Sequence, residues 1–346
     1  MDPRRVLVLT GGQLDVFTAK TAVALLRYCR DEVVAVLDAE HAGQDLAELV
    51  GVGGGVPIVD SVAAALPFEP DHLAIGAVFP GGVLPATWRA SILEAVQAGL
   101  HVINGLHTPL GADAQLVECA ARHGACLYDL RDVSREYPVG GGRAARTRAK
   151  RILTVGSDCN LGKMLTALEL VAELNRRGHR AEFVATGQTG VMVAGRGEVL
   201  DAVKSDFVAG AVEALVTEAD ETGCEFIVVE GQGALLHPGF SAVTLGLMHG
   251  ALPDLMILCH DPSRTIMRHS QIHVPPLDRL IALHEAILEP LHASKVIGIA
   301  INGFGQSADR LSESIRAAAQ ATGLPSTDCV ACGAGPLAGA VLESST

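Results

Sequence analysis

The sequence predicts an α/β protein with two successive domains, each built on a parallel β-sheet. Three observations support this fold class. Short apolar segments alternate with helical segments along most of the chain, as in strand–helix–strand units with right-handed crossovers. The 346 residues are enough for two domains. Hydrophobic residues make up 49% of the chain and aromatic residues only 3%, which is typical of helices packed closely on parallel strands.

The first half alternates strands and helices in a regular order. Strands are expected over Val6–Leu9, Glu32–Leu37, Ala74–Phe79, His101–Asn104 and Cys126–Asp129, and helices over Ala19–Cys29, Trp88–Ala98 and Asp113–His123. This alternation predicts a Rossmann-like N-terminal domain over residues 1–140.

The glycines of this half do not form a dinucleotide-binding turn. The turn that starts at Thr10 follows the first strand but lacks the G-x-G-x-x-G spacing that brings a backbone close to a pyrophosphate. Gly51–Gly55 follows a helix, and no helix begins directly behind it. We therefore interpret these glycines as turns, with NAD binding as an unsupported alternative. Gly81 and Gly82 are expected to line the cleft between the domains.

A glycine-rich, basic segment over residues 141–150 joins the two halves. Gly140–Gly142 stand at its start, and Arg143, Arg146, Arg148, Lys150 and Arg151 follow in close succession through it and just beyond it. This composition is typical of a solvated linker. The alternative is that one or two of the arginines reach the phosphates of a ligand.

The second half, residues 151–346, begins with the strand–loop–helix pattern of a phosphate-binding P-loop. A short strand over Ile152–Val155 precedes the loop, and a helix over Met164–Arg177 follows it, with Gly178 closing the helix. The candidate cofactor-binding residues are Gly156, Ser157, Asp158, Cys159, Asn160, Leu161, Gly162, Lys163 and Met164. The loop N–H groups, the helix N-terminus and the Lys163 charge together favour an anion. The pattern predicts a P-loop NTPase-like domain.

Two features distinguish this loop from G-x-x-x-x-G-K-[ST]. Five residues, not four, separate Gly156 from Gly162, and Met164 stands where a Ser or Thr hydroxyl would hold Mg²⁺. Because metal-assisted phosphoryl transfer normally uses that hydroxyl, we expect the loop to hold a phosphate that does not react.

Further candidate residues follow the later strands. Glu230 ends an apolar strand that begins at Phe226, at the edge where parallel sheets bind ligands. A structural carboxylate that caps the turn is the alternative. Arginines just past a strand end suit a substrate carboxylate. The predicted substrate-binding residues are Gln188, Thr189, Gln232, Arg264 and Arg268, and Asn302 is predicted to contact the base of a nucleotide.

Composition excludes several partners and compartments. A net charge of −13 argues against wrapping a nucleic-acid backbone. No apolar run approaches the length of a membrane span, and no signal peptide is apparent. Eight scattered cysteines favour free thiols in the cytoplasm. Cys329 and Cys332 form one CxxC, which we interpret as buried thiols because a zinc site needs further ligands. The size and apolar content favour a homo-oligomer.

The combination of motifs resembles the D-glutamate N-acetyltransferase family. The resemblance covers nearly the whole chain and rests on these segments: Gly156–Met164, Thr186–Gly190, Asp201 with Ser205–Phe207, Glu230–Gly233 with His237–Pro238, Val274–Leu277, Pro80–Gly82 and Asn104–His107. Leu165 departs from the Thr expected in close relatives. The resemblance implies transfer of an acetyl group from acetyl-CoA to the amine of a D-amino acid, and a C-terminal domain akin to dethiobiotin synthetase.

Two enzyme mechanisms and one binding role follow. In the acetyltransferase reading, the loop holds CoA phosphates, Glu230 is the first choice of general base and His237 the second, and no metal is required. In the alternative, an ATP-dependent enzyme activates a carboxylate, and Asp158, Asp206 and Glu230 gather Mg²⁺. The third reading is a nucleotide sensor without catalysis.

Overall fold

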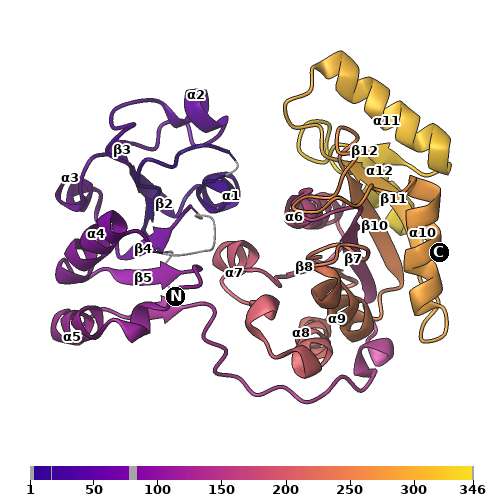
Figure 1. The fold of residues 1–346 in the computed structure, drawn as a ribbon, viewed down its shortest axis with the longest axis horizontal. Coiled ribbons are helices and arrows are strands. Elements are labelled where there is room, and N and C mark those ends of the chain that lie inside the picture. Colours follow the sequence, from indigo (N-terminus) through magenta and orange to yellow (C-terminus); the bar gives the residue numbers. More distant parts are fainter. Residues whose placement is uncertain (1–3, 17, 78–83, 345–346) are drawn as a thin grey trace. The chain divides into compact units, whose positions relative to one another are not determined.

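Figure 1 shows the computed structural model, which describes residues 4–16, 18–77 and 84–344. The chain forms two compact units. The N-terminal unit consists of residues up to Ser134 together with Val191–Arg196, and the C-terminal unit consists of Arg135–Gly190 and Gly197 onward. Gly81 and Gly82, and the end of the strand predicted over Ala74–Phe79, lie outside the described residues.

The N-terminal unit contains a six-stranded sheet in the order β3-β2-β1-β4-β5-β6, and all neighbouring strands are parallel. The strands are β1 (Val6–Leu9), β2 (Val33–Leu37), β3 (Ile58–Val59), β4 (His72–Ile75), β5 (His101–Asn104) and β6 (Leu127–Asp129). Because the strand order reverses at β1, a topological switch point lies between β1 and β4.

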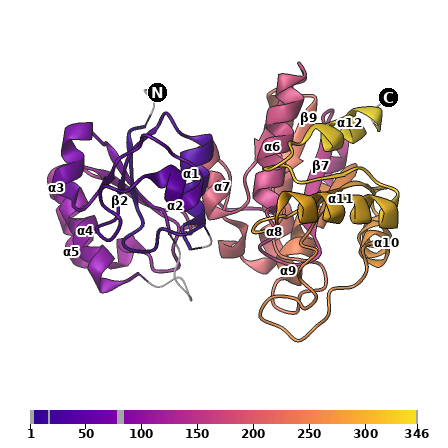
Figure 2. The ribbon, with the colours of Figure 1, turned by 90° about the horizontal axis from the view of Figure 1, so that it is seen from above.

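Helices cover both faces of this sheet. They are α1 (Lys20–Tyr28), α2 (Leu46–Val50), α3 (Val62–Ala65), α4 (Ala86–Gln97) and α5 (Ala114–His123). Figures 1 and 2 show α1 and α2 on one face and α3, α4 and α5 on the other. Local signals fix the helix ends: Asp113 accepts hydrogen bonds from the first-turn N–H groups of α5, and Gly124 ends that helix in the left-handed conformation.

The C-terminal unit contains a second parallel sheet, in the order β12-β11-β10-β7-β9-β8. Its strands are β7 (Lys150–Gly156), β8 (Ala181–Val184), β9 (Phe226–Val229), β10 (Leu255–His260), β11 (Lys295–Ile301) and β12 (Ser326–Thr327). Its helices are α6 (Lys163–Arg176), α7 (Gln188–Ala194, whose second half belongs to the N-terminal unit), α8 (Val208–Glu221), α9 (Ser241–Ala251), α10 (Leu277–Leu288), α11 (Ala308–Thr322) and α12 (Gly335–Glu343).

The central strands of this sheet are buried from both sides. Helices α6 and α12 pack together on one face, and α8 and α9 pack together on the other (Figure 2). All four residues of β9 and the first five of β10 are buried, as expected for continuous apolar strands in a parallel sheet. The two sheets confirm the α/β fold predicted from the sequence.

Arg151 corrects the prediction of a solvated basic linker. Arg143, Arg146 and Arg148 are exposed as expected, but Arg151 lies within β7 and only 3% of its side chain is exposed. Its guanidinium donates to the carbonyls of Leu252 and Ala144, to the Thr147 hydroxyl and to the Asp254 carboxylate. The arginine thus joins the entry to β7 with the entry to β10, and sequence spacing alone does not reveal these partners.

We predict that Arg151→Ala lowers the free energy of unfolding by about 3 kcal/mol, because the change leaves buried carbonyls and a carboxylate without their cation. Urea denaturation followed by circular dichroism measures the loss. The control is Arg176→Ala, because Arg176 forms an exposed pair with Glu173 and should contribute less than about 1 kcal/mol. Equal effects of the two variants would contradict this account of Arg151.

Candidate functional site

The P-loop predicted from the sequence forms as a turn between β7 and α6. Asn160 and Gly162 both have positive φ angles, 57° and 87°, and Gly162 is the N-cap residue of α6. No side chain caps this helix. The N–H groups of its first turn are therefore directed to the loop, where they favour an anion.

Lys163 places its ammonium group inside this loop. Its Nζ donates to the Asp158 carbonyl at 2.9 Å, and the residue is only 6% exposed. Burial lowers the pKa of the ammonium, while the nearby Cys259 and Cys159 thiols and Asp158 oppose that shift. A Cβ on Gly156 would lie 2.9 Å from Nζ, so a glycine at that position leaves room for the lysine.

Asp158 attaches the P-loop to the segment that follows β10. Its Oδ1 accepts from the backbone N–H of Cys159 at 2.7 Å, and its Oδ2 accepts from Arg264 Nη1 at 2.9 Å and from the N–H of Arg268 at 2.7 Å. The residue is fully buried. Burial alone would raise the pKa of Asp158, but these hydrogen bonds and the Arg264 charge outweigh it and hold the pKa below its usual range. Asp158 is thus a structural carboxylate of the loop.

Arg264 has structural contacts that the sequence did not predict. Its Nη1 donates to both the Asp158 carboxylate and the Cys159 carbonyl, so this part of the guanidinium is occupied within the protein. These contacts anchor the loop, and a role of Arg264 in holding a substrate carboxylate stays a prediction. Arg268 has an exposed side chain whose Nε lies 3.3 Å from His269 Nε2, and its role in substrate binding stays a prediction.

His237 is buried and bonded at both ring nitrogens. Nδ1 accepts from the N–H of Gly239 at 3.1 Å, so Nε2 carries the proton and donates to the Arg268 carbonyl at 2.6 Å. The hydrogen bonds assign this tautomer. Because both ring nitrogens bond to backbone groups, the contacts favour a structural role for His237, and its second-choice assignment as general base stays a prediction.

One group of metal-ligating side chains gathers among the described residues, namely Asp158, Cys159 and His237. Its lone pairs are largely engaged, because both Asp158 oxygens and both His237 nitrogens already bond to protein groups. The predicted alternative set of Asp158, Asp206 and Glu230 does not come together as a cluster in the described chain. Asp206 lies on an exposed turn before α8.

Glu230 follows β9 and faces the loop after β8, as its position predicted. Its Oε2 accepts from the N–H groups of Thr186 and Gly187 at 2.9 and 3.1 Å, and Thr186 Oγ1 donates to its carbonyl. A Cβ on Gly190 would lie 2.2 Å from Oε2. The carboxylate therefore positions the turn that begins α7, where the predicted substrate residues Gln188 and Thr189 lie. These contacts favour the structural alternative, and a catalytic role stays a prediction.

Gln232 and Asn302 occupy the same edge of the sheet. Gln232 Nε2 donates to the carbonyl of Thr186 and, at 3.2 Å, to its hydroxyl. Gly231, just before it, donates to Thr154 Oγ1, and a Cβ there would collide with the Thr154 carbonyl. The amide Nδ2 of Asn302 lies 4.0 Å from the position of a Cβ on Gly162. Asn302 thus lies near the P-loop, its Oδ1 accepts from the N–H of Phe304, and its contact with the base of a nucleotide stays a prediction.

Sequence reasoning missed a contact between a hydroxyl of the loop and a histidine. Ser157 Oγ lies 2.9 Å from His260 Nδ1, and Ser157 is buried. Burial lowers the pKa of the His260 imidazole, with the Asp261 charge opposing. His260 ends β10 beside β7; the only signal in the sequence was that two adjacent strands end in polar residues.

Comparisons with known proteins agree with this architecture. The family model described as "Domain of unknown function (DUF1611_C) P-loop domain" matches residues 138–338, and the model described as "Domain of unknown function (DUF1611_N) Rossmann-like domain" matches residues 39–133. The chain belongs to the DUF1611 family. The crystal structure of a DUF1611 family protein from Anabaena variabilis is 40% identical, covers 98% of this chain and 99% of that chain, and has a TM-score of 0.93.

Two curated relatives of this DUF1611 chain bear the same name. A protein of Tritonibacter scottomollicae named D-glutamate N-acetyltransferase is 33% identical over 97% of both chains. Another of that name, from Pseudoalteromonas sp, is 35% identical over 78% of this chain and 80% of the relative. The family resemblance inferred from the sequence is thereby confirmed. Among the helices of the described residues, none has the length and hydropathy that a membrane span requires.

We predict that Asp158→Asn destabilises the protein by about 2 kcal/mol at pH 7, because an amide replaces a charged, buried acceptor. The folded pKa lies below the unfolded value of about 3.9, so the carboxylate stabilises the fold above that pH. The difference from wild type should persist from pH 7 to about pH 5 and narrow as the pH falls below about 4. Urea denaturation across this range measures it.

The matched control for this prediction is Asp309→Asn, which changes an exposed carboxylate on α11. It should alter stability by less than about 0.5 kcal/mol at pH 7. A constant Asp158→Asn deficit down to pH 3 would show that the carboxylate does not titrate with unfolding as described.

Proposed function

We propose that the chain is an acetyl-CoA-dependent N-acetyltransferase that acts on the amine of a D-amino acid, with D-glutamate as the first candidate acceptor. The observation that carries this proposal is the similarity, over 97% of both chains, to a relative named D-glutamate N-acetyltransferase. The geometry of the P-loop is a second, independent argument for this proposal.

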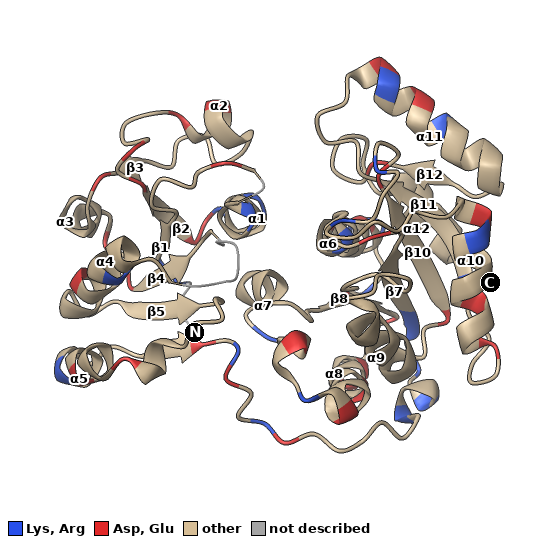
Figure 3. Ribbon diagram, in the orientation of Figure 1, with Lys and Arg blue, Asp and Glu red and all other residues tan. Residues whose placement is uncertain are grey.

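The loop residues fit the phosphates of a CoA molecule. Gly162 starts α6 without a side-chain cap, and Lys163 directs a buried ammonium into the loop. Both groups attract an anion without needing to react with it. Because the net charge is −13, the attraction must come from these local groups. Figure 3 shows acidic and basic residues interspersed along the elements of each unit.

The residues beside Lys163 suit the binding of a phosphate that does not react better than they suit phosphoryl transfer. Met164 provides no hydroxyl, and the hydroxyl of Thr166, one residue beyond Leu165, is buried and accepts from the Cys259 thiol at 3.6 Å. The loop therefore has no Ser or Thr at the position where P-loop enzymes hold Mg²⁺. In an acetyl transfer, by contrast, the CoA phosphates bind and orient while the thioester reacts.

Acetyl transfer needs three contributions from the protein: groups that bind the CoA phosphates, a cation for the carboxylates of the acceptor, and a proton acceptor for the amine. The P-loop and Lys163 supply the first. Arg268, with its exposed guanidinium, is the arginine that we assign to the acceptor. Glu230 is our first candidate for the proton acceptor.

The assay combines purified protein, acetyl-CoA and a panel of D- and L-amino acids, with products identified by mass spectrometry. A parallel set contains ATP and Mg²⁺. We expect an N-acetyl product without ATP, formed fastest with D-glutamate. Release of ADP with a carboxylate substrate, and no acetylated amine, would replace this function with carboxylate activation. A thiol dye is unsuitable because the described chain has exposed free cysteines, including Cys126 and Cys332.

We predict that Lys163→Ala weakens binding of CoA at least tenfold, because a charge-assisted contact to a phosphate contributes about 1.5–3 kcal/mol. Isothermal titration calorimetry with CoA measures the affinity. The control is Lys295→Ala, since Lys295 is an exposed lysine at the start of β11, the opposite edge of the same sheet. Unchanged affinity in Lys163→Ala would remove the P-loop from CoA binding.

A further inference from the structure

The segment after β10 presents basic side chains in an acidic protein. The chain has a net charge of −13, yet residues 262–277 contain two arginines and two histidines and neither aspartate nor glutamate. The segment turns back on itself, because the N–H of Met267 donates to the Ile272 carbonyl and that of Val274 donates to the Thr265 carbonyl. We call residues 265–274 the basic hairpin. Its composition favours an anionic ligand.

Two backbone hydrogen bonds hold the tip of the basic hairpin against the P-loop. The N–H of Arg268 donates to Asp158 Oδ2 at 2.7 Å, and the Arg268 carbonyl accepts from His237 Nε2 at 2.6 Å. Asp158 and His237 are both buried. Because the two backbone groups of Arg268 bond to buried side chains of the same unit, the residue is fixed beside the loop, while its side chain stays exposed.

The next residue, His269, adopts a backbone conformation that glycine adopts more readily than histidine. Its φ angle is 57°, in the left-handed region. A glycine here would relieve the strain and leave the backbone hydrogen bonds of Arg268 in place. Such strain persists only where the surrounding structure imposes it, and it is concentrated at ligand-binding and active sites. The histidine therefore points to a role other than stability.

Arg268 determines which nitrogen of the His269 ring carries the proton. Arg268 Nε lies 3.3 Å from His269 Nε2. Because a guanidinium can only donate, His269 Nε2 is the acceptor, and the proton of the neutral ring lies on Nδ1. Among the residues that the structure describes, neither Nδ1 of His269 nor the Nη atoms of Arg268 have a hydrogen-bond partner. The two exposed side chains therefore offer adjacent N–H donors, some of them on a cation.

This set of donors suits a carboxylate. A guanidinium binds a carboxylate through two parallel N–H donors, and the imidazole beside it adds another. A phosphate would accept from the same groups. The phosphates of a ligand, however, already have Lys163 and the first-turn N–H groups of α6 inside the P-loop, which leaves the donors of the basic hairpin for a second, carboxylate-bearing molecule.

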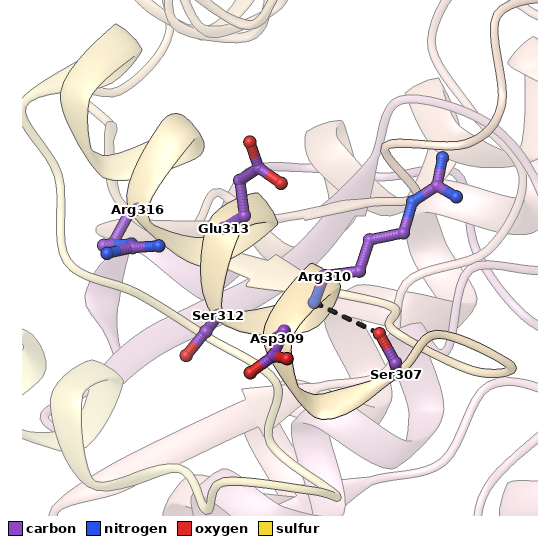
Figure 4. A pocket seen from close by; sticks show the side chains of 6 residues that line it. All are labelled: Ser307, Asp309, Arg310, Ser312, Glu313 and Arg316. Atoms are coloured by element: carbon purple, nitrogen blue, oxygen red, sulfur yellow. Dashed lines mark hydrogen bonds between the residues drawn. The ribbon is translucent and has the colours of Figure 1, made fainter.

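The open groove along α11 has arginines too, but acids accompany them. It is lined by two arginines, two serines, an aspartate and a glutamate, namely Ser307, Asp309, Arg310, Ser312, Glu313 and Arg316. Figure 4 shows these side chains pointing in different directions from one helix and its cap. Because the acids offset the arginines, this groove does not favour an anion as the basic hairpin does.

We propose that Arg268 and His269 together bind a carboxylate of the amine acceptor, which makes His269 a further substrate-binding residue. The identity of the ligand rests on the proposed function. The guanidinium of Arg268 supplies the charge, and its Nε orients the imidazole so that Nδ1–H donates to the carboxylate. The two backbone bonds of Arg268 keep both side chains beside the P-loop, and the left-handed turn at His269 places the imidazole next to the guanidinium.

The experiment compares His269→Gly with His273→Ala in the acetyl-transfer assay. Glycine adopts the left-handed conformation without strain, so His269→Gly should stay folded, which circular dichroism checks. We expect it to raise KM for D-glutamate about tenfold, because a donor to a charged acceptor is lost, and to leave kcat and the affinity for CoA within about twofold of wild type. His273 is the matched control because it belongs to the same hairpin, where it forms a β-bridge with Ile266. Its variant should keep the wild-type KM.

A further variant separates the paired donors from charge alone. Arg268→Lys keeps the charge but removes the Nε donor that orients His269, and we expect it to raise KM for D-glutamate about tenfold as well. Wild-type KM in both His269→Gly and Arg268→Lys would overturn the proposal. Weaker binding of CoA by His269→Gly, with an unchanged KM for D-glutamate, would assign the donors to a phosphate instead. An equal rise of KM in His273→Ala would show that the pair has no special role.

Direct binding distinguishes a failure of this inference from a failure of the proposed function. Glutarate has two carboxylates and no amine, so it binds without being acetylated. We expect His269→Gly to bind glutarate about tenfold more weakly than wild type in isothermal titration calorimetry. Equal binding by the two proteins, or none by either, would overturn the carboxylate site even if D-glutamate is acetylated. If the wild-type protein acetylates none of the amines but the difference in glutarate binding is present, the proposed function fails and the carboxylate site stands.

Discussion

The buried carboxylate of Asp158 is the interaction on which the arrangement of the P-loop depends. A carboxylate with no exposed surface is stable only if charged or polar groups of the protein replace water around it. Here Cys159, Arg264 and Arg268 do so, and two of these partners belong to the segment after β10. The loop is therefore shaped by a second segment about 105 residues further along the chain, as the contact between Arg264 and Cys159 shows. The sequence of the loop alone does not determine its conformation.

The close approach of glycine backbones is a second constraint on the loops around Lys163. Gly231 approaches the Thr154 carbonyl so closely that a Cβ would lie 1.5 Å from its oxygen, and a Cβ on Gly190 would overlap the Glu230 carboxylate. These glycines allow the loops after β8 and β9 to meet beside Lys163. Larger residues there would separate the loops and expose polar groups that now bond to each other. The motif Glu230–Gly233 is thus explained mainly by backbone approach, whichever reaction the site performs.

The sequence predicted the elements well because periodicity and turn residues are local signals. The bounds of β1 and β5 agree with the prediction, and the P-loop lies between the strand and helix expected of it. Partners were not predictable in the same way. Arg151 was assigned to solvent because its neighbours are basic, yet its acceptors come from residues near 145 and near 253. Met192 lies in the second half of the chain but is buried in the core of the N-terminal unit.

Because the sequence does not reveal hydrogen-bond partners, it also could not identify the reactive residues. A carboxylate after a strand marks the ligand-binding edge of a parallel sheet, and both Glu230 and Asp38 occupy such positions. Position does not reveal whether loop N–H groups already occupy the oxygens. In this protein loop N–H groups donate to both carboxylates. Each carboxylate therefore fixes the conformation of the loop beside it. Beside Glu230 and the P-loop, Lys163 is a cation available to an anionic ligand, held in a glycine-lined loop. A lysine in this position attracts the phosphates of a ligand through its charge, without the help of a metal ion.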